Sequence, residues 1–180
     1  MRTIIALAAL TAAMVPVPAQ AATACPAPTR AELKGTDTDK PAKGGKALRG
    51  VRIRHLPKGF SHGTLTAAKR GGVTEYGYLW SDDRDTVDPA HRSLWVRVVC
   101  WPKASSLAQL GKLPVEVGAF TGGPKAVRLG GRQVLGQEGD GALGHGRYVG
   151  WVERKGVVVT VMASRPLVPE LADLVRGIRL

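Results

Sequence analysis

Cysteine is scarce in this sequence, with only Cys25 and Cys100 among 180 residues. A structural zinc site needs closely spaced cysteines or histidines, and two isolated cysteines do not supply them. In an oxidising compartment an even pair instead favours a disulfide, here between the mature N-terminus and a strand in the middle of the domain. Pairing would also exclude a cysteine nucleophile, because the nucleophile is the thiolate.

Long apolar segments are missing after the first 21 residues. The densest later run, Val157 to Met162, has the length of a buried strand. A membrane-spanning helix needs about 20 apolar residues. The sequence therefore predicts no transmembrane segment in the mature chain.

No short motif of a common enzyme has the context that it needs. S-x-x-K does not occur, and the four histidines are too far apart for a zinc motif. Gly59 to Gly63 matches G-x-S-x-G, but a nucleophile elbow needs a strand before the serine and a helix after it, and here a predicted turn precedes it and a weak predicted strand follows. Gly139 to Gly144 matches G-x-G-x-x-G, but a dinucleotide site needs this turn between a strand and a helix, and here another strand follows. We therefore predict no cofactor and a mobile loop. His145, in the same loop as Arg147, is the first residue to test as a catalytic base.

The N-terminus has the three parts of a secretory signal peptide. Arg2 supplies a positive charge, residues 4–15 form an apolar run, and Ala19-Gln20-Ala21 provides a small-x-small cleavage site. The apolar run has no polar face, so it does not fit a core helix. We predict that residues 1–21 are a cleaved signal and that the mature protein is secreted or extracytoplasmic.

Cys25 allows a second interpretation. Ala22-Thr23-Ala24-Cys25 loosely resembles the lipobox of bacterial lipoproteins, although Ala22 stands where leucine is usual. In those proteins the cysteine is lipidated and anchors the mature chain to a membrane. Lipidation and a disulfide to Cys100 exclude each other, because both need the sulfur of Cys25.

Basic residues outnumber acidic ones by 26 to 14, which gives a formal net charge of +12. A positive field favours anionic lipid head groups, wall polymers that carry phosphate, or nucleic acid, which is the least available to an exported protein. The alternative is that the charge only keeps a small domain soluble. The expected contacts to an anionic envelope partner are Arg52, Arg54, Arg128, Arg132 and Arg147.

Composition divides the mature chain into two parts. Residues 22–48 are rich in Pro, Lys, Gly, Asp and Thr and poor in apolar side chains, which is typical of a flexible arm. Residues 49–180 are predicted to form a single domain, because their number suits one hydrophobic core.

Apolar and polar residues alternate in several segments, as they do in strands. The clear cases are 51–56, 73–80, 93–101, 148–154 and 157–163, and the weaker ones are 65–67, 115–120, 126–129 and 133–135. Segment 93–101 is apolar on both faces, which predicts a central strand covered on both sides. Gly130-Gly131 and Lys155-Gly156 are typical of hairpin turns.

Two helices are expected. A short one covers 104–113, where Leu107 and Leu110 are three residues apart. The second is C-terminal, with Pro169 in its first turn. Its apolar stripe comprises Leu171, Leu174, Val175 and Ile178. The fold class predicted is α+β: a curved antiparallel sheet with the short middle helix and the C-terminal helix packed on one face.

Aspartates gather between Ser81 and Pro89, in a predicted loop. Oxygen-rich loops suit Ca²⁺, which makes Asp83, Asp85 and Asp88 weak candidates for metal ligands. The spacing does not match an EF-hand. The alternative is a solvated turn in which an aspartate caps the next element.

Aromatic residues make up only 5% of the chain, yet they share strand faces. The residues concerned are Tyr76, Tyr78 and Trp80 in one segment and Trp95 and Trp101 in another. Such stripes usually belong to the core. If exposed, they would form a platform for a glycan, a peptide or an acyl chain.

The C-terminal fifth of the chain combines a strand ending in Trp, a glycine turn, an apolar strand and an amphipathic helix with Glu-Leu. These features span Gly150–Val161 and Leu167–Val175. The stretch is similar to the end of exported bacterial domains associated with anti-sigma factors, the MucB/RseB-like sensors. The resemblance implies a half-open antiparallel sheet wrapped on helices, with an apolar cleft for lipid or a regulatory peptide, and it implies no catalytic residues.

These expectations favour an exported, non-catalytic binding or sensing module for a lipid or peptide ligand, with the five aromatic residues lining its site. One alternative is a basic envelope-associated protein that binds anionic wall polymers or lipid head groups. Another is a small extracellular hydrolase or enzyme inhibitor. Nucleic acid is not an expected partner.

Overall fold

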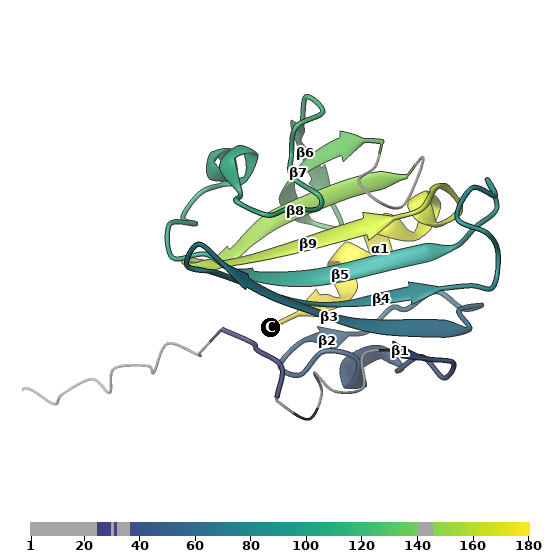
Figure 1. Ribbon diagram of the computed structural model, residues 1–180. Helices are drawn as coiled ribbons and strands as arrows, with labels where there is room; N and C mark the ends of the chain where they lie inside the picture. Colours follow the sequence, from purple (N-terminus) through teal and green to yellow (C-terminus); the bar gives the residue numbers. More distant parts are fainter. Residues whose placement is uncertain (1–24, 30, 32–36, 140–145) are drawn as a thin grey trace, which may run out of the picture.

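A computed structural model describes residues 25–29, 31, 37–139 and 146–180. The predicted signal peptide, most of the G-x-G-x-x-G pattern and the candidate base His145 lie outside these ranges. The main element of the described chain is one antiparallel sheet (Figure 1). Its strands are β1 (Asp37–Thr38), β3 (His62–Arg70), β4 (Val73–Ser81), β5 (Ser93–Cys100), β6 (Lys125–Leu129), β7 (Arg132–Glu138), β8 (Arg147–Arg154) and β9 (Val157–Ala163). Their order in the sheet is β1-β3-β4-β5-β9-β8-β7-β6.

The remaining elements are short. A two-stranded ladder pairs β2 (Arg52–Ile53) with β10 (Ile178–Arg179). The helical elements are the 3₁₀ turns η2 (Gly44–Lys46), η3 (Leu107–Lys112) and η4 (Arg165–Glu170) and the α-helix α1 (Leu171–Gly177). The chain is therefore an α+β protein, as predicted from its sequence.

The middle of the sheet is buried on both faces. β5 pairs with β9 over seven residues, from Leu94↔Ala163 to Cys100↔Val157. Every residue of β9 is buried. The prediction of a central, doubly covered strand over 93–101 is thus confirmed. The run at 157–163 is apolar throughout because β9 is also covered on both faces.

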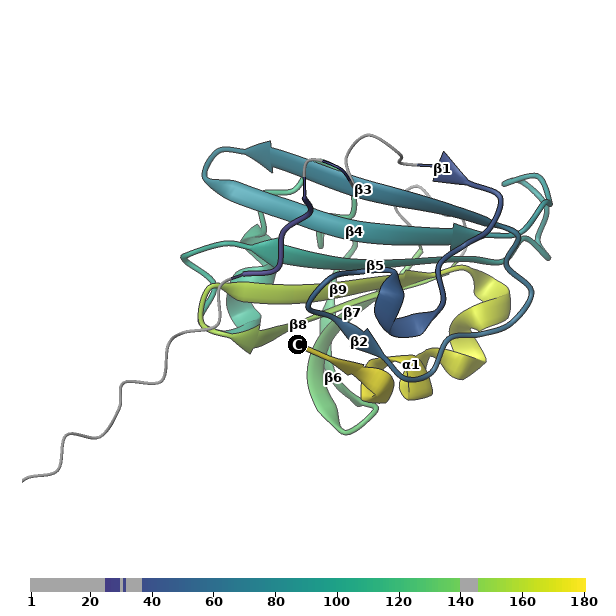
Figure 2. The same ribbon diagram turned by 90° about the horizontal axis from the view of Figure 1, so that it is seen from below.

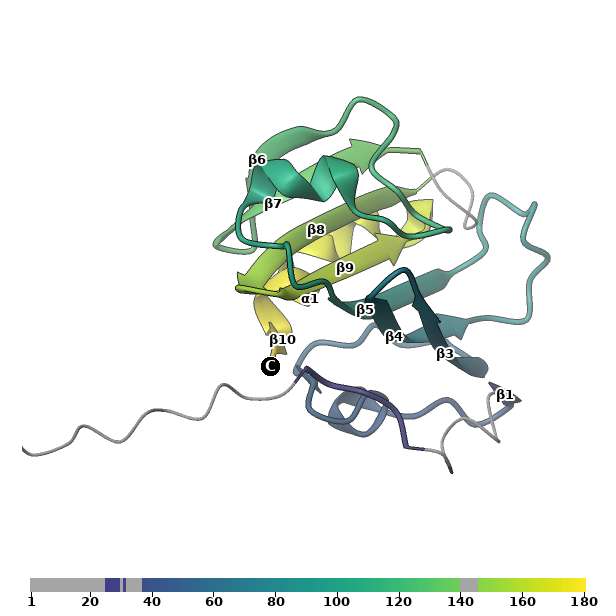
Figure 3. The ribbon, with the colours of Figure 1, turned by 60° about the vertical axis from the view of Figure 1, so that its left-hand side comes forward.

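Two core layers lie on opposite faces of the sheet, because alternate residues of a strand point to opposite sides. Val98 and Val159 pack with Leu174 of α1 in one layer. Val99 and Val158 pack with Leu110 of η3 in the other. Figure 3 shows η3 and α1 on opposite sides of β8 and β9. The expectation that both helices cover one face is therefore wrong, since the sheet has two apolar faces and each needs a cover.

The N-terminal segment contributes to the core on the α1 side. Ala47 and Leu48 are buried there, although the sequence places them in the flexible arm. β1 also pairs with the edge of β3, through Asp37↔Thr64 and Thr38↔Gly63. The packed region therefore begins before the boundary at residue 49.

Other predicted elements differ in extent. The alternating segment 51–56 forms only the two-residue strand β2, and 115–120 forms no strand, although Val115 and Phe120 are buried. Pro169 lies inside η4 and precedes α1, which starts at Leu171. The weaker candidates at 65–67, 126–129 and 133–135 fall within β3, β6 and β7.

A disulfide joins Cys25 to Cys100 at the end of β5, with their Cα atoms 6.0 Å apart. The predicted pairing is present, and it occupies the sulfur that lipidation of Cys25 would need. Within the described ranges, no helix is long and apolar enough to cross a membrane.

The disulfide should stabilise the fold strongly, because its cysteines are 75 residues apart. Closing a loop of that length removes chain entropy from the unfolded state, worth about 4 kcal/mol. We expect the double variant Cys25→Ser/Cys100→Ser to lose about that much unfolding free energy in a urea titration. Each single serine variant should lose a similar amount. A loss below about 1 kcal/mol would show that the unfolded chain is already restrained.

Candidate functional site

The aromatic stripe belongs to the core. Tyr76 and Trp80 have no exposed surface, Tyr78 is 5% exposed and Trp101 is 9% exposed. Trp95 is half-buried. Four of the five residues proposed to line a ligand cleft are thus covered by the protein itself, and the sequence alternative in which the stripe is core fits them.

The polar ends of these buried rings fix the N-terminal segment. The hydroxyl oxygen of Tyr78 accepts the backbone N–H of Ala42, and that of Tyr76 accepts the N–H of Arg49, both at 3.0 Å. The indole N–H of Trp80 donates to the carbonyl of Ala42 at 2.8 Å. Buried aromatic rings need such partners for their polar atoms. The aromatic stripe therefore binds the N-terminal segment that covers it.

Removing one hydroxyl should loosen this cover. In Tyr78→Phe the N–H of Ala42 loses its acceptor, which should lower the unfolding free energy by about 1 to 2 kcal/mol. Amide hydrogen exchange at Ala42 should accelerate, while exchange in β9 follows only the global loss. Equal acceleration at both places would mean that the cover does not open separately from the sheet.

Trp95, the least buried member, belongs to a structural arginine site. The Arg97 guanidinium lies 4.4 Å from the Trp95 ring centroid. It donates to Thr160 Oγ1 and Glu75. Further bonds go to the carbonyls of Val117 and Gly118 and to the Tyr148 hydroxyl. All three guanidinium nitrogens have partners, so Arg97 holds the segment at 117–118 and leaves no free donor for an anionic ligand.

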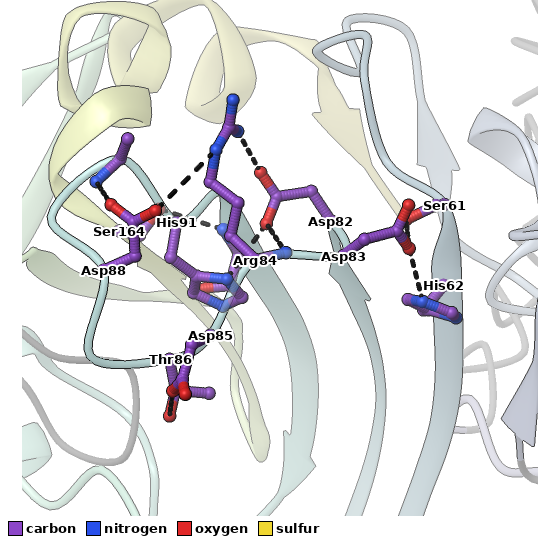
Figure 4. A network of polar contacts seen from close by, with 12 residues as sticks. Ser61, His62, Asp82, Asp83, Arg84, Asp85, Thr86, Asp88, His91 and Ser164 are labelled. Carbon is purple, nitrogen blue, oxygen red and sulfur yellow. Dashed lines mark hydrogen bonds and ion pairs between the residues drawn. The ribbon is translucent and has the colours of Figure 1, made fainter.

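The aspartates of the loop between β4 and β5 do not converge (Figure 4). Asp83 accepts the hydroxyl of Ser61 at 2.6 Å. Asp85 accepts the N–H of Val87, and Asp88 that of Ala90. Among the described residues, no three His, Cys, Asp or Glu side chains are placed to hold a metal ion. Asp85 and Asp88 fit the alternative of a turn closed by its own side chains, whereas Asp83 ties the loop to Ser61 and His62 at the start of β3.

Asp82 is the buried member of this loop. Its carboxylate lies 3.0 Å from Nδ1 of buried His91 and 2.6 Å from Nη1 of Arg84. Burial by itself would raise the pKa of Asp82, but hydrogen bonds from Arg92 and Arg84 and the charge of His91 outweigh it, so the pKa lies below its ordinary value. The group anchors the loop as a carboxylate.

Ser164 lies in the same region (Figure 4). Its Oγ accepts the backbone N–H of Ser93 at 2.9 Å. Within the described structure no hydrogen bond joins it to His91. A serine nucleophile needs such a bond to its base, so this Ser, His and Asp do not have the geometry of a catalytic triad.

The lowered pKa of Asp82 makes the fold sensitive to acid. A carboxyl with a depressed folded pKa contributes stability above its unfolded pKa of about 4, and the contribution is lost as the pH falls through the folded value. Thermal melts of Asp82→Asn should therefore lie below wild type at neutral pH and converge with it in acid. Asp85→Asn, in the same loop, is the control and should track wild type. Parallel curves for Asp82→Asn and wild type would contradict this role.

The five arginines proposed for an anionic partner do not form one site. Arg132 pairs with Glu153 at 2.7 Å and donates to the carbonyl of Ile178, so it is a structural residue. Arg147 pairs with Glu138 at 2.6 Å. Arg128 is exposed on β6. Only Arg52 and Arg54 are neighbours: Arg52 is in β2, and Arg54 directly follows that strand.

A stronger signal lies around β2, and it was visible in the sequence. Between Asp39 and Glu75 there are nine basic residues and no acidic one. Seven of them fall within residues 40–58: Lys40, Lys43, Lys46, Arg49, Arg52, Arg54 and Lys58. None of these seven takes part in the ion pairs of the described chain. Counting basic residues without noting where acidic ones are missing overlooks this segment.

The fold brings another arginine to this segment. Arg52 of β2 is directly opposite Arg179 of β10, and both are exposed. β2, η2 and the C-terminus lie side by side in Figure 2. They border an open hollow of about 430 Å³ lined by Gly45, Gly50, Val51, Arg52, Arg179 and Leu180. We call it the basic hollow; its two glycines have no side chains to fill it.

In comparisons with protein-family models, curated proteins and solved structures, the chain matches none of them. The segments 150–161 and 167–175 lie in β8 and β9 and in η4 and α1. None of the comparisons bears on the resemblance to MucB/RseB-like domains, which stays a prediction.

Proposed function

We propose that this protein is a non-catalytic, envelope-associated binding protein whose basic hollow takes phosphate groups of an anionic polymer or lipid. The observation that carries the proposal is the pair of exposed arginines Arg52 and Arg179, opposite each other on the β2–β10 ladder, with Arg52 in a stretch of sequence that has no acidic residue. An exported location is part of the proposal, and the disulfide is compatible with it.

Phosphate suits the chemistry of the basic hollow. Arginine presents a planar fork of N–H donors that matches two phosphate oxygens, and two such forks side by side can share one phosphate or adjacent ones. The lysines at 43 and 46 add positive charge nearby. Because none of these cations is paired with a described carboxylate, an arriving anion does not have to displace one. The net charge of +12 would speed its approach.

The other functions considered from the sequence have less support. An acyl or peptide cleft lined by aromatic rings would need Tyr76, Tyr78 and Trp80 to be accessible, and they are core residues. A serine hydrolase would need a serine bonded to a histidine base; Ser61 donates to Asp83, which also pairs with His62, and no hydrogen bond among the described residues joins Ser61 to His62. An electrostatic binding role needs neither an open aromatic cleft nor a nucleophile. It uses the lysine and arginine cations of residues 40–58, which take part in no ion pair of the described chain.

Binding to long-chain polyphosphate and to vesicles containing phosphatidylglycerol tests the proposal. We expect the double variant Arg52→Ala/Arg179→Ala to bind at least about tenfold more weakly, since each charged contact contributes about 1 kcal/mol or more. Binding by wild type should fall steeply as salt rises, because exposed charges are screened. Fluorescence anisotropy and vesicle co-sedimentation measure the two cases.

Lys112→Ala/Arg165→Ala is the matched control, because it also removes two exposed cations but lies in η3 and η4. It should lose only the small effect of lower net charge. If both double variants lost the same binding affinity, the net charge of the protein would explain binding, and the basic hollow would not be a specific site. Binding to polyphosphate alone identifies a polymer as the source of the phosphate, and binding to vesicles alone identifies a lipid.

A further inference from the structure

We propose that the free edge of β6 is a second binding site, which receives an extended acidic segment of a partner protein as an added strand. This inference is independent of the basic hollow. It rests on the position of β6, on the direction of its backbone groups, on a hollow beside it and on its charge.

β6 ends the sheet. Its described neighbour is β7, and no described strand pairs with its other edge. All five of its residues are exposed or half-exposed, and Val127 keeps 40% of its surface. An edge of this kind presents unpaired N–H and C=O groups that can pair with another chain.

The hairpin register identifies the free groups. β6 and β7 are joined by Gly130-Gly131, whose positive φ values of 56° and 82° fit a two-residue turn. Leu129 is opposite Arg132, and the ladder continues without a bulge to Lys125↔Gly136. In an antiparallel ladder, hydrogen-bonded pairs alternate with pairs that are not hydrogen-bonded. A two-residue turn makes Leu129↔Arg132 a hydrogen-bonded pair, so the backbone N–H and C=O groups of Lys125, Val127 and Leu129 point toward β7. The N–H and C=O groups of Ala126 and Arg128 then point outward.

A hollow of about 320 Å³ accompanies this edge. Its apolar part is formed by Val127, Leu129 and Val149, and Lys125 lies at its rim. Gly136 leaves the hollow open, because it is opposite Lys125 and has no side chain. An added strand would place every second side chain over this hollow, since alternate residues face the same side.

Charge indicates the chemistry of the added strand. Lys125 and Arg128 point to opposite faces of β6, and neither joins an ion pair among the described residues. Arg147 at the rim is already paired with Glu138. We therefore expect an apolar side chain opposite Val127 and acidic side chains near the two free cations. A second copy fits less well, because each copy carries a net charge of +12.

The probe is a blocked heptapeptide in which a central valine is flanked on each side by aspartates at one and two residues; with the valine opposite Val127, aspartates then lie opposite Arg128 and Lys125. We expect it to bind the full chain, to slow hydrogen exchange at the amides of Ala126 and Arg128, and to shift their NMR signals. A peptide with lysine in place of each aspartate, and one with N-methylated alternate amides, should each bind at least about tenfold more weakly, because they lose the charge contacts or the main-chain bonds.

Ala126→Pro is the decisive variant. It removes an N–H that points away from β7, so the ladder to β7 stays intact and an edge strand tolerates the change. It should weaken peptide binding at least about fivefold. Ala126→Ser keeps the N–H and should bind as wild type. Gly136→Val should also weaken binding, because a side chain there would contact Val127 and Val149 at ordinary distances and fill the hollow.

Three outcomes would overturn the proposal. The first is no binding of the aspartate peptide at millimolar concentration. The second is binding that Ala126→Pro leaves unchanged. The third is a dimer in sedimentation velocity that Ala126→Pro abolishes, which would assign the edge to a second copy. Loss of polyphosphate binding in the arginine double variant affects none of these results, so the two proposals fail separately.

Discussion

The pairing of β5 with β9 in a sheet that is apolar on both sides is the constraint on which the rest of the structure depends. Neither face of this pair can be left in water, so each needs a cover. One cover is α1 with the N-terminal segment, and the other is η3 with the segment that follows it. Both covers are short and irregular, and polar anchors fix them: Tyr76, Tyr78 and Trp80 bind one, and Arg97 binds the other.

The strands could be predicted from sequence because each carries its signal locally. Alternation at 73–80 and continuous burial at 157–163 depend only on which faces are covered. The covers could not, because their conformation depends on distant partners. Leu48 lies in a stretch rich in Lys, Arg and Gly, and it is a core residue because it packs in the cluster that contains Tyr76, Tyr78 and Trp80 of β4. For the same reason the stripe could not be assigned: its spacing is identical whether a ligand or the protein's own chain covers it.

The basic residues of the described chain include both cations paired with carboxylates and cations that are unpaired and exposed, and the composition alone does not distinguish them. Most carboxylates of the described chain pair with arginines, and in two of these pairs, Arg97 with Glu75 and Arg132 with Glu153, both side chains are largely buried. The segment 40–58 has no acidic residue, and its cations stay exposed around η2 and β2. The formal charge of +12 is therefore less informative than its distribution, which the pairing in the fold decides.

The C-terminal end of α1 links the two proposed surfaces. Arg132, at the start of β7 and opposite Leu129 of β6, donates to the carbonyls of Val175 and Ile178, which belong to the last helical turn and to β10. A cation is favourable at this end of a helix, where backbone carbonyls lack partners. The contact fixes the residue before Arg179, while the N–H of Arg54 binds the carbonyl of Gly177 from the β2 side. Arg132 was expected to bind an anion itself. It instead positions the strand whose arginine faces the basic hollow.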